Sequence, residues 1–158
     1  LMQWIGGPVE SVYADCRTAY HDIEVEDLAN VMLKFQSGAN GVIVSSTCFR
    51  PAMKSRIEIH GTKGSAIFNG EYDELYFWQV DGDPEKIDAP EGFTFGDVTN
   101  PYLFPMERHR ANLLEVLAAH EEGRESMVSG REALKAEEII LAIYESSRQG
   151  KRVDVRQP

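Results

Sequence analysis

Two hydrophobic periods divide this sequence into a front part and a back part. Several stretches between residues 9 and 80 alternate apolar and polar side chains, which is the period of a β-strand. Between residues 106 and 150, apolar residues recur at helical spacing instead. A run of strands followed by a run of helices predicts an α+β fold. The expected architecture is a large, mostly antiparallel sheet with helices packed on one face, which leaves the other face open.

Short polar or glycine-rich connections separate the alternating stretches. The predicted strands cover residues 9–20, 29–36, 41–49, 56–60, 65–69 and 75–80, with an edge strand at 85–89 and a last short strand at 153–155. Residues 37–41 tolerate positive φ and predict a hairpin. Residues 61–64 predict a tight turn between two strands.

Two helices are predicted at the back of the chain. The first carries Met106, Leu113, Leu114 and Leu117 at helical spacing and ends at Gly123. The second begins with the capping box Ser129-Gly130-Arg131-Glu132 and stops near Gly150. Its expected apolar stripe is Ala133, Ala136, Ile140, Ile143 and Tyr144.

The opening residues are typical of the last turn of a helix. Gly6, Gly7 and Pro8 end that turn, but no N-cap or first turn precedes Leu1. One interpretation is a frayed terminus. The interpretation favoured here is that an upstream segment has been removed.

Several predicted strands carry apolar groups on both sides. The residues concerned are Tyr13, Met32, Ile43, Phe49, Tyr76 and Trp78. Because a large apolar face is rarely left exposed on a monomer, we expect a homodimer or tetramer formed through the open sheet face.

Length and charge limit the classes of function. The chain has 158 residues, of which 42% are hydrophobic, so one domain with a real core is expected. The net charge of −10 makes nucleic acid and membrane surfaces poor partners. No membrane-spanning stretch or signal peptide is visible. Cys16 and Cys48 are too few for a disulfide framework, which favours a cytoplasmic protein.

Sequence motifs for catalysis are missing. There is no G-x-G-x-x-G motif and no G-x-S-x-G motif. The four histidines and two cysteines are scattered, so a metal site could arise only by convergence in space, and none is expected. We therefore expect no catalytic, cofactor-binding or metal-ligating residue in this chain.

Two polar groups are the candidate site residues. Arg50, Lys54 and Arg56 flank the connection between two strands. They favour either a solvated edge or a rim that binds hydroxyls or a carboxylate. Tyr102, Arg108 and His109 form a second, weaker group near a helix start.

The order of several motifs resembles a known family. The motifs are Gly7-Pro8-Val9-Glu10-Ser11-Val12-Tyr13-Ala14, Val25-Glu26-Asp27, Phe35-Gln36-Ser37-Gly38-Ala39-Asn40-Gly41, Arg56-Ile57-Glu58-Ile59-His60-Gly61-Thr62-Lys63-Gly64-Ser65 and Ala142-Ile143-Tyr144-Glu145-Ser146-Ser147-Arg148-Gln149-Gly150-Lys151-Arg152-Val153. Together they resemble the C-terminal domain of the glucose–fructose oxidoreductase / inositol dehydrogenase / MocA (Gfo/Idh/MocA) family.

The resemblance implies a function for the whole protein. Family members are NAD(P)-dependent oxidoreductases that act on sugars, inositols and related polyols. Their N-terminal Rossmann domain holds NAD or NADP and carries the catalytic lysine. Their C-terminal domain lines the substrate site and forms the oligomer interface. Residues 1–158 then correspond to the substrate-binding and oligomerisation domain, without the Rossmann domain. The fragment alone is expected to bind no cofactor and to be inactive.

The substrate wall departs from one branch of the family. Inositol-dehydrogenase-like members carry Tyr-Asp-Gln-Arg where this chain has Met53-Lys54-Ser55-Arg56. Arg56 agrees, but Met53 cannot hydrogen-bond a hydroxyl as a tyrosine does, which argues against an inositol substrate. Lys54 and Arg50 suit a substrate with a carboxylate, such as a sugar acid. The alternative hypothesis is a stand-alone, non-enzymatic binding or assembly module that keeps the sheet without the chemistry.

Overall fold

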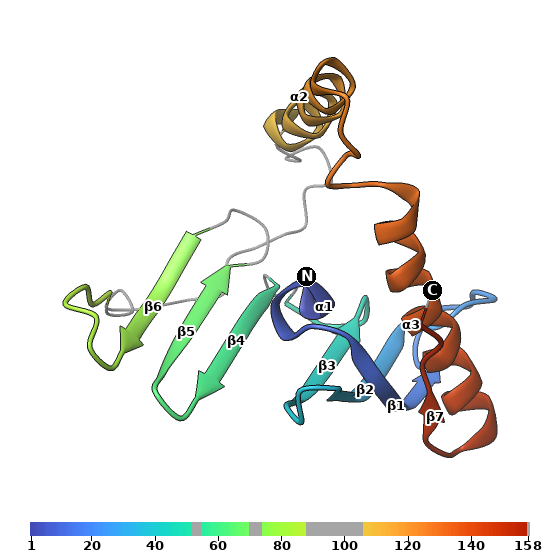
Figure 1. The fold of residues 1–158 in the computed structure, drawn as a ribbon. Helices are drawn as coiled ribbons and strands as arrows, with labels where there is room; N and C mark the ends of the chain where they lie inside the picture. Colours follow the sequence, from blue (N-terminus) through green and yellow to red (C-terminus); the bar gives the residue numbers. More distant parts are fainter. Residues whose placement is uncertain (52–54, 70–73, 88–105, 158) are drawn as a thin grey trace. The chain divides into compact units, whose positions relative to one another are not determined.

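The computed structural model describes residues 1–51, 55–69, 74–87 and 106–157 (Figure 1). The elements in chain order are α1 (Met2–Gly6), β1 (Val9–Arg17), β2 (Leu28–Phe35), β3 (Asn40–Ser46), β4 (Arg56–Gly61), β5 (Gly64–Asn69), β6 (Glu74–Val80), α2 (Met106–Glu122), α3 (Gly130–Gln149) and β7 (Val153–Asp154). They fall into two compact units. Unit 1 comprises residues 1–48 and 104–158, and unit 2 comprises residues 49–103.

Unit 1 is built on a four-stranded antiparallel sheet in the order β3-β2-β1-β7. The α3 helix packs along β1 (Figure 1). Between them lies a core of small and medium-sized apolar side chains. Its buried members are Val9, Val12, Ala14, Val31, Leu33, Phe35, Ala142 and Val155. The α+β class and the antiparallel pairing predicted from the strand periods are confirmed.

The ends of α3 follow the predicted signals. Ser129 is the N-cap, and its hydroxyl accepts the amide of Glu132 at 3.4 Å. The Glu132 carboxylate instead pairs with Lys135 at 2.5 Å, so the Ser129 half of the capping box is formed. Gly150 ends the helix with φ 63°, a left-handed conformation that favours glycine.

The predicted stripe of α3 is wrong in part. The side chains that face the sheet are Ile139, Ala142, Ile143 and Ser146. Of the predicted residues, Ala133, Ala136, Ile140 and Tyr144 are exposed. The helix is in contact with the sheet mainly through its second half, so the apolar residues of its first turns do not mark the buried face.

Two serines of α3 complete the hydrogen bonding of β1. The short strand β7 pairs with β1 only at Ser11 and Val12. Farther along β1, the Ser146 hydroxyl accepts the Ala14 amide at 3.0 Å, and the Ser147 hydroxyl accepts the Cys16 amide at 2.8 Å. Ser146 is fully buried and also donates to the Lys151 carbonyl at 2.6 Å. The helix thus takes the place of a longer neighbouring strand.

The opposite face of this sheet is open within unit 1. It presents Tyr13, Met32, Val42 and Val44, which are all exposed; Met32 is 62% exposed. Tyr13 lies opposite Met32, and Met32 lies opposite Val42 in the ladders. The sequence placed Ile43 among the residues of a second face, but Ile43 packs on the core. Period-two alternation therefore puts its neighbours Val42 and Val44 on the open face.

Unit 2 contains a three-stranded antiparallel meander in the order β4-β5-β6. Its apolar side chains are mostly half-buried, and Ala66 is buried. A Cβ at Gly64 would lie 2.3 Å from the Gln79 carbonyl oxygen, so close strand packing requires a glycine there. The edge strand predicted at 85–89 is reduced, in the described residues, to one bridge between Trp78 and Ile87.

The α2 helix forms as predicted, but its apolar stripe is exposed. Met106, Leu113 and Leu117 are each more than half exposed, whereas Ala119 is buried. Among the helices of the described residues, none is long and apolar enough to cross a membrane.

Candidate functional site

The predicted site residues lie around the connection between β3 and β4 and near the start of α2. Arg50 is exposed in a bend and precedes a cis bond to Pro51. Arg56 opens β4. Met53, Lys54 and Tyr102 lie outside the described residues.

The second predicted group is only partly described. Arg108 lies in α2, but the structure does not describe its side chain. His109 lies in the same helix and is exposed. The structure therefore assigns Arg50 and Arg56 to unit 2 and His109 to unit 1.

Arg56 belongs to a row of polar side chains on β4. Its Nε lies 2.6 Å from Oε1 of Glu58, and the Nε2 of His60 lies 3.4 Å from the other oxygen of that carboxylate. The His60 Nδ1 is 2.9 Å from the Ser65 hydroxyl on β5. The row thus places a cationic group beside a hydrogen-bond acceptor. The cation can bind an acidic ligand, and the acceptor can bind a ligand rich in hydroxyls.

Glu58 and His60 are not among the residues that the basic cluster in the sequence indicates. The signal that could have found them is period-two spacing, since residues 56, 58 and 60 of one strand share a face. That spacing was used only to identify the strand.

The beginning of the β3–β4 connection is anchored by Asp27. Its main-chain carbonyl accepts the Thr47 amide at 3.0 Å and the Ser46 hydroxyl at 2.9 Å. The Ser46 hydroxyl also accepts the Cys48 amide at 2.9 Å. These bonds turn the chain out of the ladder, which explains why β3 ends at Ser46 rather than at the predicted residue 49.

The carboxylate of Asp27 organises the turn between β1 and β2. It accepts the amides of Ala19 at 2.5 Å, Tyr20 at 3.0 Å and His21 at 2.7 Å. These donors hold the pKa of Asp27 far below its usual range, although burial of the carboxylate opposes them. Because those amides bond to a side chain instead of a strand, β1 ends at Arg17 and not at the predicted residue 20.

The same turn is fastened to α3. The Tyr144 hydroxyl donates to both oxygens of Glu26, at 2.9 and 3.1 Å. The hydrogen bond to Glu26, and then burial, raise the pKa of Tyr144. Tyr144 is therefore a polar tie to the turn and not a member of the buried stripe.

Both cysteines carry free thiols. Burial is the main cause that raises the pKa of each thiol, Cys16 and Cys48. A raised pKa keeps a thiol protonated at neutral pH, so neither has the thiolate character of a nucleophile.

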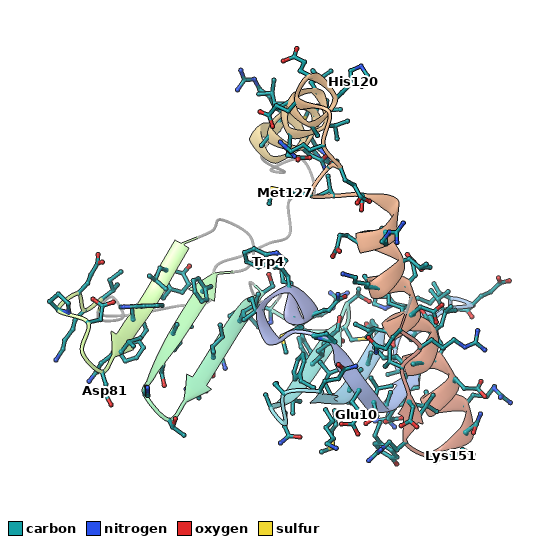
Figure 2. The ribbon with its side chains drawn as sticks, viewed as in Figure 1. Trp4, Glu10, Asp81, His120, Met127 and Lys151 are labelled. Carbon is teal, nitrogen blue, oxygen red and sulfur yellow. The ribbon has the colours of Figure 1, made fainter. Side chains whose placement is uncertain are left out.

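Two hollows in unit 1 lie away from the predicted residues. One, of about 290 Å³, is lined by residues that include Trp4, Lys135 and Arg156. Trp4 lies on α1 (Figure 2). The other, of about 370 Å³, is lined by residues that include Cys16, Glu26 and Tyr144. No predicted site residue lines either hollow.

Comparison with known proteins identifies the relatives of this fold. The family model described as the GFO/IDH/MocA C-terminal domain matches residues 1–67. A solved WlbA dehydrogenase from Bordetella pertussis, in complex with NADH and UDP-GlcNAcA, superposes with a TM-score of 0.78 and 29% identity. The match covers 100% of this chain and 44% of that one. The resemblance to the Gfo/Idh/MocA C-terminal domain is confirmed.

Two more relatives support this Gfo/Idh/MocA likeness. The D-apiose dehydrogenase of Rhizobium rhizogenes is 26% identical over 167 residues, which cover 98% of this chain and 45% of the enzyme. An oxidoreductase from Agrobacterium radiobacter, in complex with NAD+, L-tartaric acid and magnesium, has 25% identity and a TM-score of 0.78. That match covers 97% of this chain and 45% of the other. The chain thus spans just under half the length of these relatives.

Proposed function

We propose that residues 1–158 are the substrate-binding and oligomerisation domain of a NAD(P)-dependent oxidoreductase that acts on a sugar, polyol or sugar acid. The observation that carries this proposal is that the entire chain matches just under half of known dehydrogenases, while its residues 1–67 match the C-terminal domain model of the family. The free thiols agree with a cytoplasmic location, which is part of the same proposal.

The described residues do not fit a dinucleotide cradle. The Gly61–Gly64 turn joins two strands, whereas a phosphate-binding turn leads from a strand into a helix. Close packing against Gln79 accounts for Gly64. We propose that NAD or NADP is held by another part of the enzyme and that this domain binds and orients the substrate.

The β3–β4 connection and the β4 row are the proposed substrate wall. Arg56 leads that row, and Arg50 lies in the connection that Asp27 anchors. Met53 and Lys54 belong to the same connection in sequence, and Tyr102, Arg108 and His109 complete the proposed set. Guanidinium groups bind carboxylates with charge-assisted hydrogen bonds, which favours a sugar acid over a neutral sugar.

The deciding experiment measures NAD(P)H formation by the full-length gene product with neutral sugars, inositols and sugar acids. The 158-residue chain serves as the blank. We expect turnover by the full-length protein, faster with acids, and none by the blank. No turnover with any substrate would favour the alternative of a non-enzymatic assembly module.

Arg56→Gln tests the wall within that enzyme. Loss of a charge-assisted bond corresponds to an increase in KM for an acidic substrate of about tenfold or more. The matched control is Arg131→Gln, an exposed arginine at the start of α3. Equal KM values in both variants would contradict the proposed role of Arg56.

We also propose that the open face of the unit 1 sheet binds a second copy of the chain. The apolar centre at Tyr13, Met32, Val42 and Val44 is bordered by ion pairs, including Lys34 with Glu10 at 2.8 Å and Arg17 with Asp15 at 3.8 Å. Glu10 lies on β1 (Figure 2). An apolar centre with a charged rim is the usual pattern of an interface between protein chains.

Light scattering of Met32→Glu tests this interface. We expect the wild-type protein to be a dimer or tetramer and the variant a monomer. Leu141→Glu is the matched control, because Leu141 is similarly exposed (59%) but lies on α3. A monomeric wild type would overturn the proposed interface without affecting the proposed activity.

A further inference from the structure

Three side chains with metal-binding donor atoms converge beside the end of β3. One ring nitrogen of His21, a carboxylate oxygen of Asp27 and the Sγ of Cys48 all lie within 4.8 Å of one another. His21 and Asp27 belong to the turn after β1, whereas Cys48 follows β3. The sequence separates Cys48 from Asp27 by a complete hairpin, so only the folded chain brings the three together.

The Asp27 carboxylate is built into the fold as a fixed anion. Its side chain is completely buried, and the amides of residues 19–21 hold it in one orientation. The imidazole Nδ1 of His21 lies 3.1 Å from Oδ2 of Asp27. A buried carboxylate costs solvation free energy unless other charges or donors compensate. A cation next to Oδ2 would add to that compensation.

Cys48 approaches the same residue from the other strand. Its Sγ lies 3.4 Å from the Asp27 carbonyl oxygen, and its amide is held by Ser46. The His21 side chain is 35% exposed, which leaves a route from solvent. The turn also carries the exposed acidic residues Asp22 and Glu24, which raise the local concentration of cations.

The donor set is that of a zinc-like ion. Imidazole nitrogen, carboxylate oxygen and thiolate sulfur together suit Zn²⁺ or Co²⁺ in a four-coordinate site with one position left for water. The site is neutral overall, because the two positive charges of the ion balance one carboxylate and one thiolate, and the imidazole is uncharged. In forming this site the ion displaces the thiol proton of Cys48 to solvent. No electron is transferred.

Metal binding requires the three donor atoms to move only slightly closer together. Zinc–ligand bonds of about 2.0–2.3 Å put tetrahedral ligands roughly 3.5 Å apart. The donor atoms lie at most 4.8 Å apart, so they must approach by no more than about 1.3 Å, and rotation of the partly exposed His21 ring contributes to this. We propose that His21, Asp27 and Cys48 bind a zinc-class divalent ion that ties the turn after β1 to the start of the β3–β4 connection. This proposal does not depend on the proposed dehydrogenase activity.

Cobalt(II) is the direct probe, because a cobalt–thiolate bond has a charge-transfer absorption that hexaaquo cobalt lacks. We expect the metal-free full chain to bind one equivalent with this absorption, and zinc to remove it by competition. Cys48→Ser should lose the absorption, and His21→Ala should raise the apparent Kd at least tenfold. The controls Cys16→Ser and His120→Ala, at the other cysteine and at an exposed histidine, should behave as wild type.

A second measurement needs no variant. Zinc should protect Cys48, but not Cys16, from alkylation in the wild-type chain, as read by mass spectrometry of the peptides. Bound zinc should also raise the Tm of wild type but not of Cys48→Ser, because a ligand that binds only the folded state stabilises it. Absence of the charge-transfer band, equal protection of both thiols, or a band that survives in Cys48→Ser would overturn the proposal.

Discussion

The two units bury their apolar residues to different extents. In unit 1, eight buried apolar residues form one cluster between the sheet and α3. In the described residues of unit 2, Ala66 is the buried apolar residue, most of the larger apolar side chains are half-buried, and Phe49 is exposed. A helix over one face of a sheet supplies a core that a three-stranded meander lacks. We therefore expect unit 1 to carry most of the stability.

Core truncation should show the largest difference between the units. Leu33→Ala removes a side chain that is 3% exposed and should lower the free energy of unfolding by about 3 kcal/mol. Ile59→Ala, at a half-buried position of β4, should cost roughly 1–2 kcal/mol. Urea unfolding followed by circular dichroism gives both values. Equal costs would show that the two cores are equivalent.

Loss of the hydrogen bonds that Ser146 and Ser147 of α3 accept from β1 should have the next largest effect on stability. Ser146→Ala leaves the Ala14 amide without its acceptor in a buried position, which should cost about 1–3 kcal/mol. Ser147→Ala, at a half-buried serine, should cost less. Hydrogen exchange should report faster exchange at Ala14 in the first variant. Unchanged exchange there would show that Ser146 does not support the edge of β1.

Gly64→Ala should destabilise unit 2 locally. The added Cβ would meet main-chain atoms of Gln79 and Val80, so strands β5 and β6 must separate at a cost of about 1–3 kcal/mol. Gly61→Ala is the matched control, because its nearest neighbour lies at an ordinary 3.7 Å. Hydrogen exchange should increase in β5 and β6 while unit 1 keeps its protection. Loss of protection throughout unit 1 would mean that the units unfold together.

Protonation of Glu115 on α2 should have the smallest of these effects. Arg124, Ser126 and the Met127 amide lower the pKa of Glu115 from 4.5 to about 2. A carboxyl whose pKa is lower in the folded state stabilises the protein above the unfolded pKa. That contribution is lost as the pH falls from about 4.5 to about 2. Because the site is solvated, the effect is small.

Thermal unfolding at several pH values measures this contribution. The Tm of wild type should fall more over that pH range than the Tm of Glu115→Gln. Glu125→Gln should follow the wild type, since Glu125 is exposed and contacts Arg124 through its main-chain carbonyl, which the substitution keeps. Parallel curves for wild type and Glu115→Gln would show that the contacts of Glu115 contribute nothing.

Local signals in the sequence predicted much of the fold. Alternation and turn signals located the six long strands of the described residues, and Ser129 and Gly150 located the ends of α3 because caps are local chemistry. The strand ends at Arg17 and Ser46 could not be predicted, since they depend on Asp27, whose bonds join the β1–β2 turn to the end of β3. Periodicity also cannot show which half of α3 meets the sheet.

The candidate site was less predictable than the fold. Arg56 was identified by its charge and its place beside a connection, but its partners Glu58 and His60 were not. The cluster of His21, Asp27 and Cys48 has no motif at all. Its residues meet because the β2–β3 hairpin returns the chain to Asp27, and such a contact is a property of the tertiary structure.

The hydrogen bonds between β1 and the two serines of α3 also limit how copies of this chain can associate. A strand with unpaired amides invites another chain to extend the sheet, which is a route to uncontrolled aggregation. On β1 the amides of Ala14 and Cys16 are already bonded to α3, so this edge offers no template there. Strand addition is blocked at that part of the edge. The self-association proposed above would therefore use the face of the sheet and not this edge.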